Sequence, residues 1–276
     1  MAIKMIALDL DGTLLTTDKR ISSRTRSVME ECKKRGIQIV PSTGRALGAV
    51  PGEILELPGV RYGIFTNGAS VWDMAQNASI AEQCIEWQTA LKTVQILRNY
   101  PLIYDMYVAG NGICERHFLS VLEDFGLSPE NCRFIRETRR TVEDLTDFLK
   151  ETRSPVQKMN LTFRDKAVKA EVRRALEQLE GLMVTSSLPW NLELNAAGTT
   201  KGSGLECLRL HLGLAKEETM ACGDGENDLP MIKTAGIGVA MANGAPFIKA
   251  QADAVTLTND RDGVAAAIER YALGTT

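Results

Sequence analysis

The sequence lacks the features that mark a membrane protein or a nucleic-acid-binding protein. It has no run of about 18 apolar residues, the length that a membrane-spanning helix needs. Its 276 residues carry 32 Lys and Arg against 35 Asp and Glu, a net charge of −3, so no excess of positive charge favours a nucleic-acid partner. We therefore expect neither membrane nor nucleic acid among its partners. Anionic ligands must be held by local groups rather than by the field of the whole protein.

The cysteines and histidines exclude two further classes, zinc-binding and disulfide-stabilised proteins. The six cysteines form no CxxC pair and show no pairing with either of the two histidines. This usage is typical of reduced, mostly buried thiols. Asp9 and Asp11 follow the first apolar run directly, which argues against a signal peptide. We expect a cytoplasmic protein, either a monomer or a small homo-oligomer, with one large domain or two.

The most informative feature that is present is a pair of acids after that first apolar run. Residues 3–8 are typical of a strand buried on both faces of a parallel sheet, and Asp9-Leu10-Asp11-Gly12-Thr13 follows it. Ligands of open α/β sheets bind beyond the carboxyl ends of the strands, where two carboxylates can hold a metal ion or attack an electrophile. A plain Asp-Gly turn is the simpler alternative. An EF-hand calcium loop is rejected, because Arg20 stands where that register requires Glu.

Two later segments carry groups suited to phosphate. The apolar stretch 36–40 leads to Ser42-Thr43-Gly44-Arg45, where a hydroxyl next to a helix start can hold a phosphate oxygen. Lys201 lies in the glycine-rich segment 198–204, where the backbone can approach closely and the ammonium suits phosphate. Each segment taken alone is also compatible with an ordinary loop.

A fourth segment gathers acids after a short strand. Residues 219–222 are apolar and lead to Gly223-Asp224-Gly225-Glu226-Asn227-Asp228. The three acids in so short a stretch, which also holds Asn227, repel one another unless a cation binds them. A solvated acidic loop is the alternative, but the apolar strand that leads into the loop favours a metal site.

The alternation of strands and helices predicts an α/β fold with a Rossmann-like parallel sheet. The expected core strands are 3–8, 37–42, 62–66, 219–222 and 237–240, and the expected core helices are 22–34, 45–57, 202–213, 227–234 and 262–272.

Between these two halves the pattern changes to that of an inserted α+β domain with an antiparallel sheet. A hairpin is expected around Gly110-Asn111-Gly112. The expected strands of the inserted domain are 102–108, 112–115, 156–163, 182–186 and 192–194. Its expected helices are 117–126, 141–151 and 165–179. The predicted organisation is therefore a core of residues 1–82 and 190–276 and an insert of residues 83–189. Such an insert can close over a site, exclude water and add contacts to a substrate.

In this order the four segments resemble the motifs of the haloacid dehalogenase superfamily. The resemblance is carried by Asp9-Leu10-Asp11-Gly12-Thr13, Thr43, Lys201 and Gly223-Asp224-Gly225-Glu226-Asn227-Asp228. Residues 1–15, residues 236–245 and Asp262-Gly263-Val264-Ala265 are similar to the Cof-type sugar phosphatases of that superfamily. The match covers the N-terminal and C-terminal thirds and becomes weak between about 83 and 190. It implies that the insert is a type IIB cap, which supplies most of the substrate specificity.

The resemblance also implies a chemistry, the Mg²⁺-dependent hydrolysis of phosphate monoesters of sugars or similar small metabolites. Asp9 would be the nucleophile that forms an aspartyl-phosphate, and Asp11 would donate a proton to the leaving oxygen and then activate water. The metal would be held by Asp9, the backbone carbonyl of Asp11, Asp224 and Asp228. The phosphate would be held by Thr43, Lys201, Asn227 and the backbone N–H groups of Leu10, Asp11 and Gly44.

One departure and several alternatives remain. Pro41 precedes Thr43 where a strand would ordinarily continue, which fits a strand end. Candidate substrate contacts in the insert are Asp105, Asn111, Arg116 and His117. The alternative for His117 is a polar residue that begins a helix and has no contact with the substrate. A phosphomutase or phosphotransferase could use the same aspartyl-phosphate. A non-catalytic metabolite-binding protein is the third reading, but such a protein would usually have lost the nucleophile, the lysine or the second acid.

Overall fold

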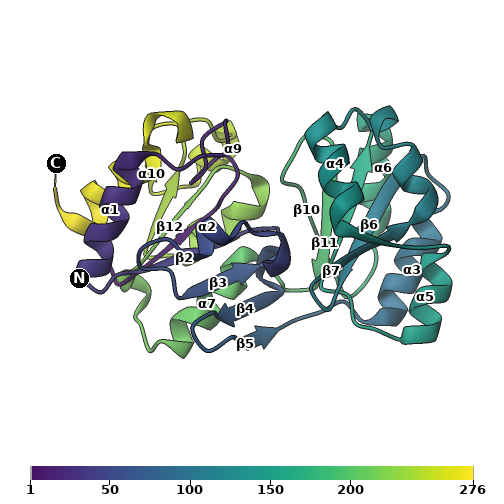
Figure 1. The fold of residues 1–276 in the computed structure, drawn as a ribbon, viewed down its shortest axis with the longest axis horizontal. Helices are drawn as coiled ribbons and strands as arrows, with labels where there is room; N and C mark the ends of the chain where they lie inside the picture. The colour runs from purple at the N-terminus through teal and green to yellow at the C-terminus, as the bar shows by residue number, and fades with distance from the viewer. Residues whose placement is uncertain (1, 276) are drawn as a thin grey trace. The chain divides into compact units, whose positions relative to one another are not determined.

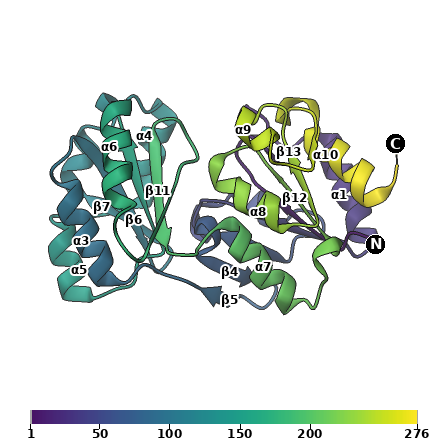
Figure 2. The same cartoon turned by 180° about the vertical axis from the view of Figure 1, so that it is seen from behind.

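The computed structural model describes residues 2–275, and the chain divides into two compact units. The first unit comprises the chain up to Arg45, Val50–Glu82 and the chain from Thr199 onward, and the second comprises Ala46–Ala49 and Gln83–Gly198. Figures 1 and 2 show the ribbon from opposite sides. Within residues 2–275, we find no helix with the length and apolar character needed to cross a bilayer.

The first unit is built on a parallel sheet of five strands in the order β14-β13-β12-β1-β2. Its strands are β1 (Met5–Leu8), β2 (Gln38–Pro41), β12 (Thr219–Gly223), β13 (Ile237–Ala240) and β14 (Ala254–Val255). The apolar residues of β1 are fully buried because the strand has a neighbour on either side and helices on both faces. The predicted fold class, a parallel core with an inserted α+β part, is confirmed.

Helices cover both faces of this sheet. They are α1 (Ser23–Lys34), α2 (Gly52–Leu55), α7 (Lys201–His211), α8 (Leu229–Thr234), α9 (Pro246–Lys249) and α10 (Gly263–Ile268), the last followed by a π-helical turn at Glu269–Leu273. Helix α1 lies beside α10, and α7 lies beside α8 (Figures 1 and 2). Leu205, Leu208 and Met231 from α7 and α8 pack on Met5 and Ala7 of β1.

A smaller antiparallel sheet extends the first unit. It consists of β3 (Tyr62–Phe65), β4 (Ser70–Asp73) and β5 (Ala78–Glu82). The sequence predicts the stretch 62–66 as a strand of the parallel sheet. Single parallel bridges do link the two regions, from Ile39 of β2 to Val60 just before β3 and from Ser42 just after β2 to Ile64 of β3. The continuous partner of β3 is β4.

The second unit is a six-stranded sheet in the order β10-β11-β9-β6-β7-β8, antiparallel except between β7 and β8. Its strands are β6 (Leu102–Val108), β7 (Asn111–Glu115), β8 (Arg139–Val142), β9 (Lys158–Phe163), β10 (Leu182–Thr185) and β11 (Asn191–Ala196). Its helices are α3 (Trp87–Leu97), α4 (Pro129–Thr138), α5 (Leu145–Thr152) and α6 (Lys166–Leu176).

The two faces of this sheet differ in polarity, as strand alternation requires. Tyr104, Met106 and Leu161 lie on one face and belong to the apolar core of the unit. The opposite face carries Asp105, which pairs in register with Asn160.

Several boundaries differ from those that the sequence predicts, each for a local reason. The helix expected at 45–57 is split by Pro51 into a 3₁₀ turn and the short α2. The helix expected at 117–126 is two 3₁₀ turns that end at Gly126. The hairpin turn lies at Ala109-Gly110, because Asn111 already pairs with Val108. The return of the chain to the first unit falls after Gly198 rather than near 190, because β11 is paired on both sides within the six-stranded sheet.

Candidate active site

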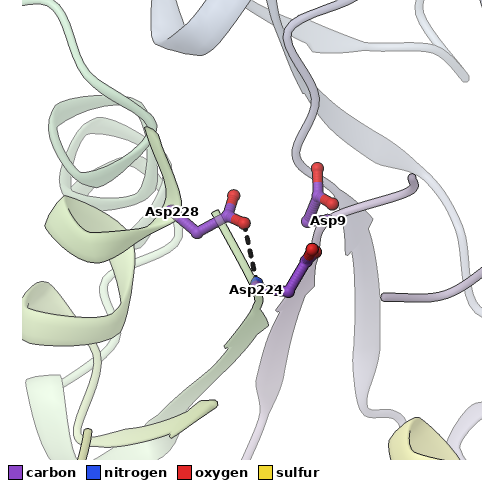
Figure 3. Close-up of side chains that lie close together, drawn as sticks. All are labelled: Asp9, Asp224 and Asp228. Atoms are coloured by element: carbon purple, nitrogen blue, oxygen red, sulfur yellow. Dashed lines mark hydrogen bonds between the residues drawn. The ribbon is translucent and has the colours of Figure 1, made fainter. Parts of the chain in front are cut away.

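Three carboxylates meet where β1 and β12 end. Asp9 follows β1, Asp224 follows β12, and Asp228 ends the 3₁₀ turn Glu226–Asp228. One carboxylate oxygen from each lies within 4.8 Å of the others, and Figure 3 shows the three side chains facing a common point. They meet because neighbouring parallel strands present their carboxyl ends at the same edge of the sheet.

Local backbone features hold the loops that carry these acids. Gly12 has φ +87°, and a Cβ at this position would lie 2.6 Å from Asp224 Oδ2, so only glycine fits. Thr13 Oγ1 donates to Asp224 Oδ1 at 2.8 Å. Asp228 Oδ2 accepts from the backbone N–H of Asp224 at 2.9 Å (Figure 3) and from that of Gly225 at 2.9 Å. The Asp228 side chain therefore binds the backbone at the start of its own loop and fixes the conformation of that loop.

Lys201 lies among these acids. Its Nζ donates to Asp9 Oδ1 and to Asp228 Oδ1, each at 2.6 Å, and the side chain is only 1% exposed. Thr200 caps the first turn of α7 by accepting from Ser203 N–H, which sets where the helix and its first residue begin. A buried ammonium paired with two carboxylates has its own charge neutralised while it favours their ionised forms.

The protonation equilibria show how strongly these groups interact. Burial, and then the charge of Asp228, raise the pKa of Asp9 well above its ordinary value, although Lys201 acts in the opposite direction. Burial and the Asp228 charge raise the pKa of Asp224 to about 6. Burial lowers the pKa of Lys201, but the charges of Asp228 and Asp9 outweigh it, so the net shift is upward. Two buried carboxylates and a partly buried one against one ammonium are short of positive charge, which a bound divalent cation would supply.

Asp11 is placed differently from these three acids. Its carboxylate is 40% exposed and is bound by Arg45 through both oxygens, with Nε to Oδ2 at 2.9 Å and Nη2 to Oδ1 at 2.8 Å. Lys19 Nζ donates to Oδ1 at 2.7 Å. The structure therefore separates the two acids of the opening motif into a buried and a partly exposed one.

The residues predicted to bind phosphate lie at the same edge of the sheet. Thr43 is buried after β2, and its Oγ1 accepts from the backbone N–H of Arg45 at 3.1 Å. Gly44 follows it and is partly buried. Asn227 is buried and donates from Nδ2 to Asn67 Oδ1 at 3.2 Å. Leu10 is fully buried between the two opening acids.

Sequence reasoning missed three polar residues around this site. Arg45 and Lys19 bind Asp11, and Asn67 binds Asn227. The signal for Asn67 was available, because Thr66-Asn67-Gly68 follows the apolar strand β3 in the same way that the other polar segments follow theirs.

The four candidates in the second unit do not form one cluster. Asp105 accepts from Arg139 Nε at 2.5 Å and from Asn160 Nδ2 at 2.9 Å. The exposed Asn111 donates to the Ala109 carbonyl. The remaining two are also exposed, with Arg116 donating to Glu143 and His117 Nδ1 lying 3.6 Å from Glu115.

The comparison with known families identifies the chain. Residues 6–268 match the family model of the haloacid dehalogenase-like hydrolases. The chain belongs to this family. The resemblance deduced from the four motifs is therefore confirmed, and the protein is an enzyme of the phosphatase type.

Individual relatives match nearly the whole chain. The 5-amino-6-(5-phospho-D-ribitylamino)uracil phosphatase YcsE of Bacillus subtilis is 32% identical over 271 residues, covering 98% of this chain and 96% of the relative. A haloacid dehalogenase-like hydrolase from Bacteroides thetaiotaomicron has a solved structure with a TM-score of 0.78 and 32% identity, covering 97% of this chain and 99% of that one. A subclass IIB sugar phosphatase of known structure has a TM-score of 0.80 and 25% identity, covering 97% and 98%.

Proposed function

We propose that this haloacid dehalogenase-like hydrolase cleaves phosphate monoesters of small metabolites, in a Mg²⁺-dependent reaction that passes through a phosphoryl group on Asp9. The observation that carries the proposal is the position of the Asp9 carboxylate. It is buried, it accepts from Lys201, and it shares one small space with Asp224 and Asp228. A carboxylate is a nucleophile only when ionised, and Lys201 favours that form.

The acidic residues suit a magnesium ion. Their donors are all oxygens, and carboxylate oxygens are the ligands that Mg²⁺ prefers. Asp9 and Asp224 would hold the ion directly, together with the backbone carbonyl of Asp11. Asp228 has both oxygens engaged, with Lys201 on one and two backbone N–H groups on the other, so it would support the site rather than close on the ion. The bound ion would neutralise part of the dianionic charge of the ester.

The residues of the chain then divide the reaction between them. An oxygen of Asp9 attacks phosphorus, the bond from phosphorus to the ester oxygen breaks, and Asp11 delivers its proton to that oxygen. In the second step Asp11 takes a proton from water, the water oxygen bonds to phosphorus, and the Asp9 carboxylate and inorganic phosphate are released. Thr43, Lys201, Asn227 and the backbone N–H groups of Leu10 and Gly44 would hold the phosphate oxygens in both steps.

The substrate class is drawn from the relatives and from the second unit. One relative is named a sugar phosphatase and another a phosphatase of a phosphorylated ribitylamino-uracil. We infer a sugar phosphate or a similar small phosphorylated metabolite for this chain. The second unit would act as its cap and would select among such substrates through the polar face that carries Asp105. The six cysteines, four of them buried, fit a cytoplasmic location.

An isotope experiment separates hydrolysis from transfer to a second sugar. The enzyme is incubated with Mg²⁺, a sugar phosphate and ¹⁸O-labelled water, and the released phosphate is analysed by mass spectrometry. A hydrolase incorporates one solvent oxygen into each phosphate that it releases. The proposal fails if phosphate appears only on an added sugar acceptor, or if chelation of the metal leaves the rate unchanged.

A further inference from the structure

A buried turn between β3 and β4 has an unusual backbone. Thr66, Asn67 and Gly68 all have positive φ, at +49°, +58° and +96°. Asparagine tolerates this region, but a β-branched threonine rarely adopts it. All three residues are buried. Strained backbone of this kind persists only where the surroundings impose it, and it concentrates at functional sites.

The surroundings of this turn are three of the segments predicted to bind phosphate. Asn67 N–H donates to the Thr43 carbonyl at 3.0 Å, and Thr66 N–H donates to the Arg45 carbonyl at 2.9 Å. A Cβ on Gly68 would lie 2.0 Å from the carbonyl oxygen of Thr200, the residue before Lys201. The turn therefore packs directly against the Thr43 segment and the start of α7.

The side chain of Asn67 reaches the third segment. Its Oδ1 accepts from Asn227 Nδ2 at 3.2 Å, and both side chains are buried. A primary amide has two N–H groups and one carbonyl, so the hydrogen bond to Asn67 decides which end of the Asn227 amide faces the neighbouring space. With one N–H directed to Asn67, the second N–H of the same nitrogen points away from Asn67 and can donate to a phosphate oxygen. The reversed amide would place two carbonyl oxygens against each other.

We propose that Asn67 is a positioning residue that orients the Asn227 amide for the phosphate group. The inference rests on the proposed function, because it assumes that Asn227 binds phosphate oxygens. Asn67 itself need not touch the substrate. Its backbone N–H holds Thr43 and its side chain holds Asn227, so one residue sets the relative position of two phosphate-binding groups. The strained turn is what brings that one residue within reach of both.

The test compares two Asn→Gly substitutions at left-handed positions. Asn67→Gly removes the amide but keeps a backbone that glycine adopts without strain. Asn77→Gly is the matched control, because Asn77 also has a positive φ, at +47°, but lies in an exposed turn. The backbone N–H of Asn77 donates to the Met74 carbonyl. Competitive inhibition by inorganic phosphate is measured for both. We expect the inhibition constant to rise about tenfold in Asn67→Gly, the equivalent of one hydrogen bond to a charged group, and to be unchanged in Asn77→Gly.

A double-mutant cycle with Asn227→Ala separates positioning from general loss of structure. In the Asn67→Gly background, Asn227→Ala should raise the inhibition constant little further, because the amide that it removes is already misplaced. In an Asn67→Asp background it should raise the constant as much as in the wild type, because the carboxylate still accepts from Asn227. Multiplicative effects of Asn67→Gly and Asn227→Ala would overturn the inference.

The remaining outcomes also decide the question. If Asn67→Gly fails to fold, the Asn67→Asp background decides alone, and the absence of an Asn227→Ala effect there overturns the inference. If inorganic phosphate has the same inhibition constant for Asn67→Gly and Asn77→Gly, the inference is wrong while the proposed function stands. If the wild-type enzyme with Mg²⁺ neither hydrolyses phosphate esters nor binds phosphate, the proposed function itself has failed.

Discussion

The guanidinium of Arg45 binds both carboxylate oxygens of Asp11, at 2.9 Å from Nε and 2.8 Å from Nη2. Burial alone would raise the pKa of Asp11, but the charge of Arg45 and the hydrogen bond and charge of Lys19 outweigh it, so the pKa is lowered. In this arrangement Asp11 is an ionised group ready to accept a proton. Its proposed role as proton donor requires that the ester draws Arg45 away, so that the acid can regain a proton near the leaving oxygen.

The role of Asp11 predicts a dependence on the leaving group. Asp11→Asn removes the proton donor, so we expect kcat for a sugar phosphate to fall by roughly 10²–10⁴-fold. The loss should be much smaller for 4-nitrophenyl phosphate in the first step, because its leaving oxygen needs little protonation. Single-turnover experiments measure the first step for both esters, as the rate at which the sugar or 4-nitrophenol is released. An equal loss for the two esters would show that Asp11 does not act as the donor.

The acidic residues predict a specific thermal response to Mg²⁺. An ion that binds only the folded protein raises Tm, and the rise grows with the ratio of the ion concentration to its Kd. We expect Mg²⁺ to raise the Tm of the wild type, and Asp224→Asn to remove most of that rise because it deletes one of the three clustered carboxylates. Asp11→Asn is the matched control, because the Asp11 carboxylate is bound to Arg45 rather than to the cluster and should leave the rise intact. A response that Asp224→Asn leaves unchanged would place the ion elsewhere.

The pairing of Asp105 with Arg139 predicts a large effect on the stability of the second unit. Both side chains are largely buried, and Arg139 also donates to the Tyr107 hydroxyl. Asp105→Ala leaves the buried guanidinium without its carboxylate, so we expect a loss of about 3–5 kcal/mol in the free energy of unfolding. The double variant Asp105→Leu with Arg139→Met should recover much of the loss. Urea unfolding of the three proteins tests this, and equal stability of Asp105→Ala and the wild type would contradict it.

The N-cap of α5 predicts a pH-dependent contribution to stability. Asp144 accepts from the N–H groups of Thr146 and Asp147 and pairs with Arg98. Burial alone would raise the pKa of Asp144, but these hydrogen bonds, with Arg98 the largest, lower it strongly. An acid with a depressed folded-state pKa stabilises the fold above its unfolded pKa near 3.9, and the contribution is lost as pH falls through the folded value.

Asp144→Ala should therefore lower Tm at pH 7 through the loss of a cap of about 1 kcal/mol, and the difference from the wild type should shrink as the pH falls below 4. Asp147→Ala is the control, because Asp147 is exposed in the same first turn and caps no N–H group. Melting curves of the wild type and both variants, recorded at pH 7 and below pH 4, measure the effect. A difference that is constant with pH would mean that Asp144 acts without its charge.

Much of the candidate site can be predicted from the sequence alone, through the polar residues that follow apolar strands. Asp9 and Asp224 each follow an apolar strand that the pattern marks, and parallel pairing brings such ends together. Lys201 carries no periodic signal of its own and was found through its glycine-rich segment and its family resemblance. The structure places its ammonium on Asp9 and Asp228.

Other features could not be read from the sequence for physical reasons. The ion pair between Asp11 and Arg45 joins residues from two different strand ends, and such a pairing leaves no mark in periodicity. Pro51 splits a helix that amphipathic spacing alone would continue. The boundary near 190 could not be placed either, because the apolar residues of β11 would suit a strand of either sheet. The structure pairs β11 with β9 in the second unit, after a loop in which Leu188 and Trp190 are exposed.

The most direct test of the central claim is the capture of the phosphoryl group on Asp9. The enzyme is mixed with Mg²⁺ and excess sugar phosphate, quenched in acid within one turnover, digested and analysed by tandem mass spectrometry. The account predicts a phosphoryl group on the peptide that contains Asp9, located at Asp9 rather than Asp11, and neither phosphopeptide nor turnover in a folded Asp9→Asn variant. Phosphoryl transfer to another residue, or normal turnover by Asp9→Asn, would contradict it.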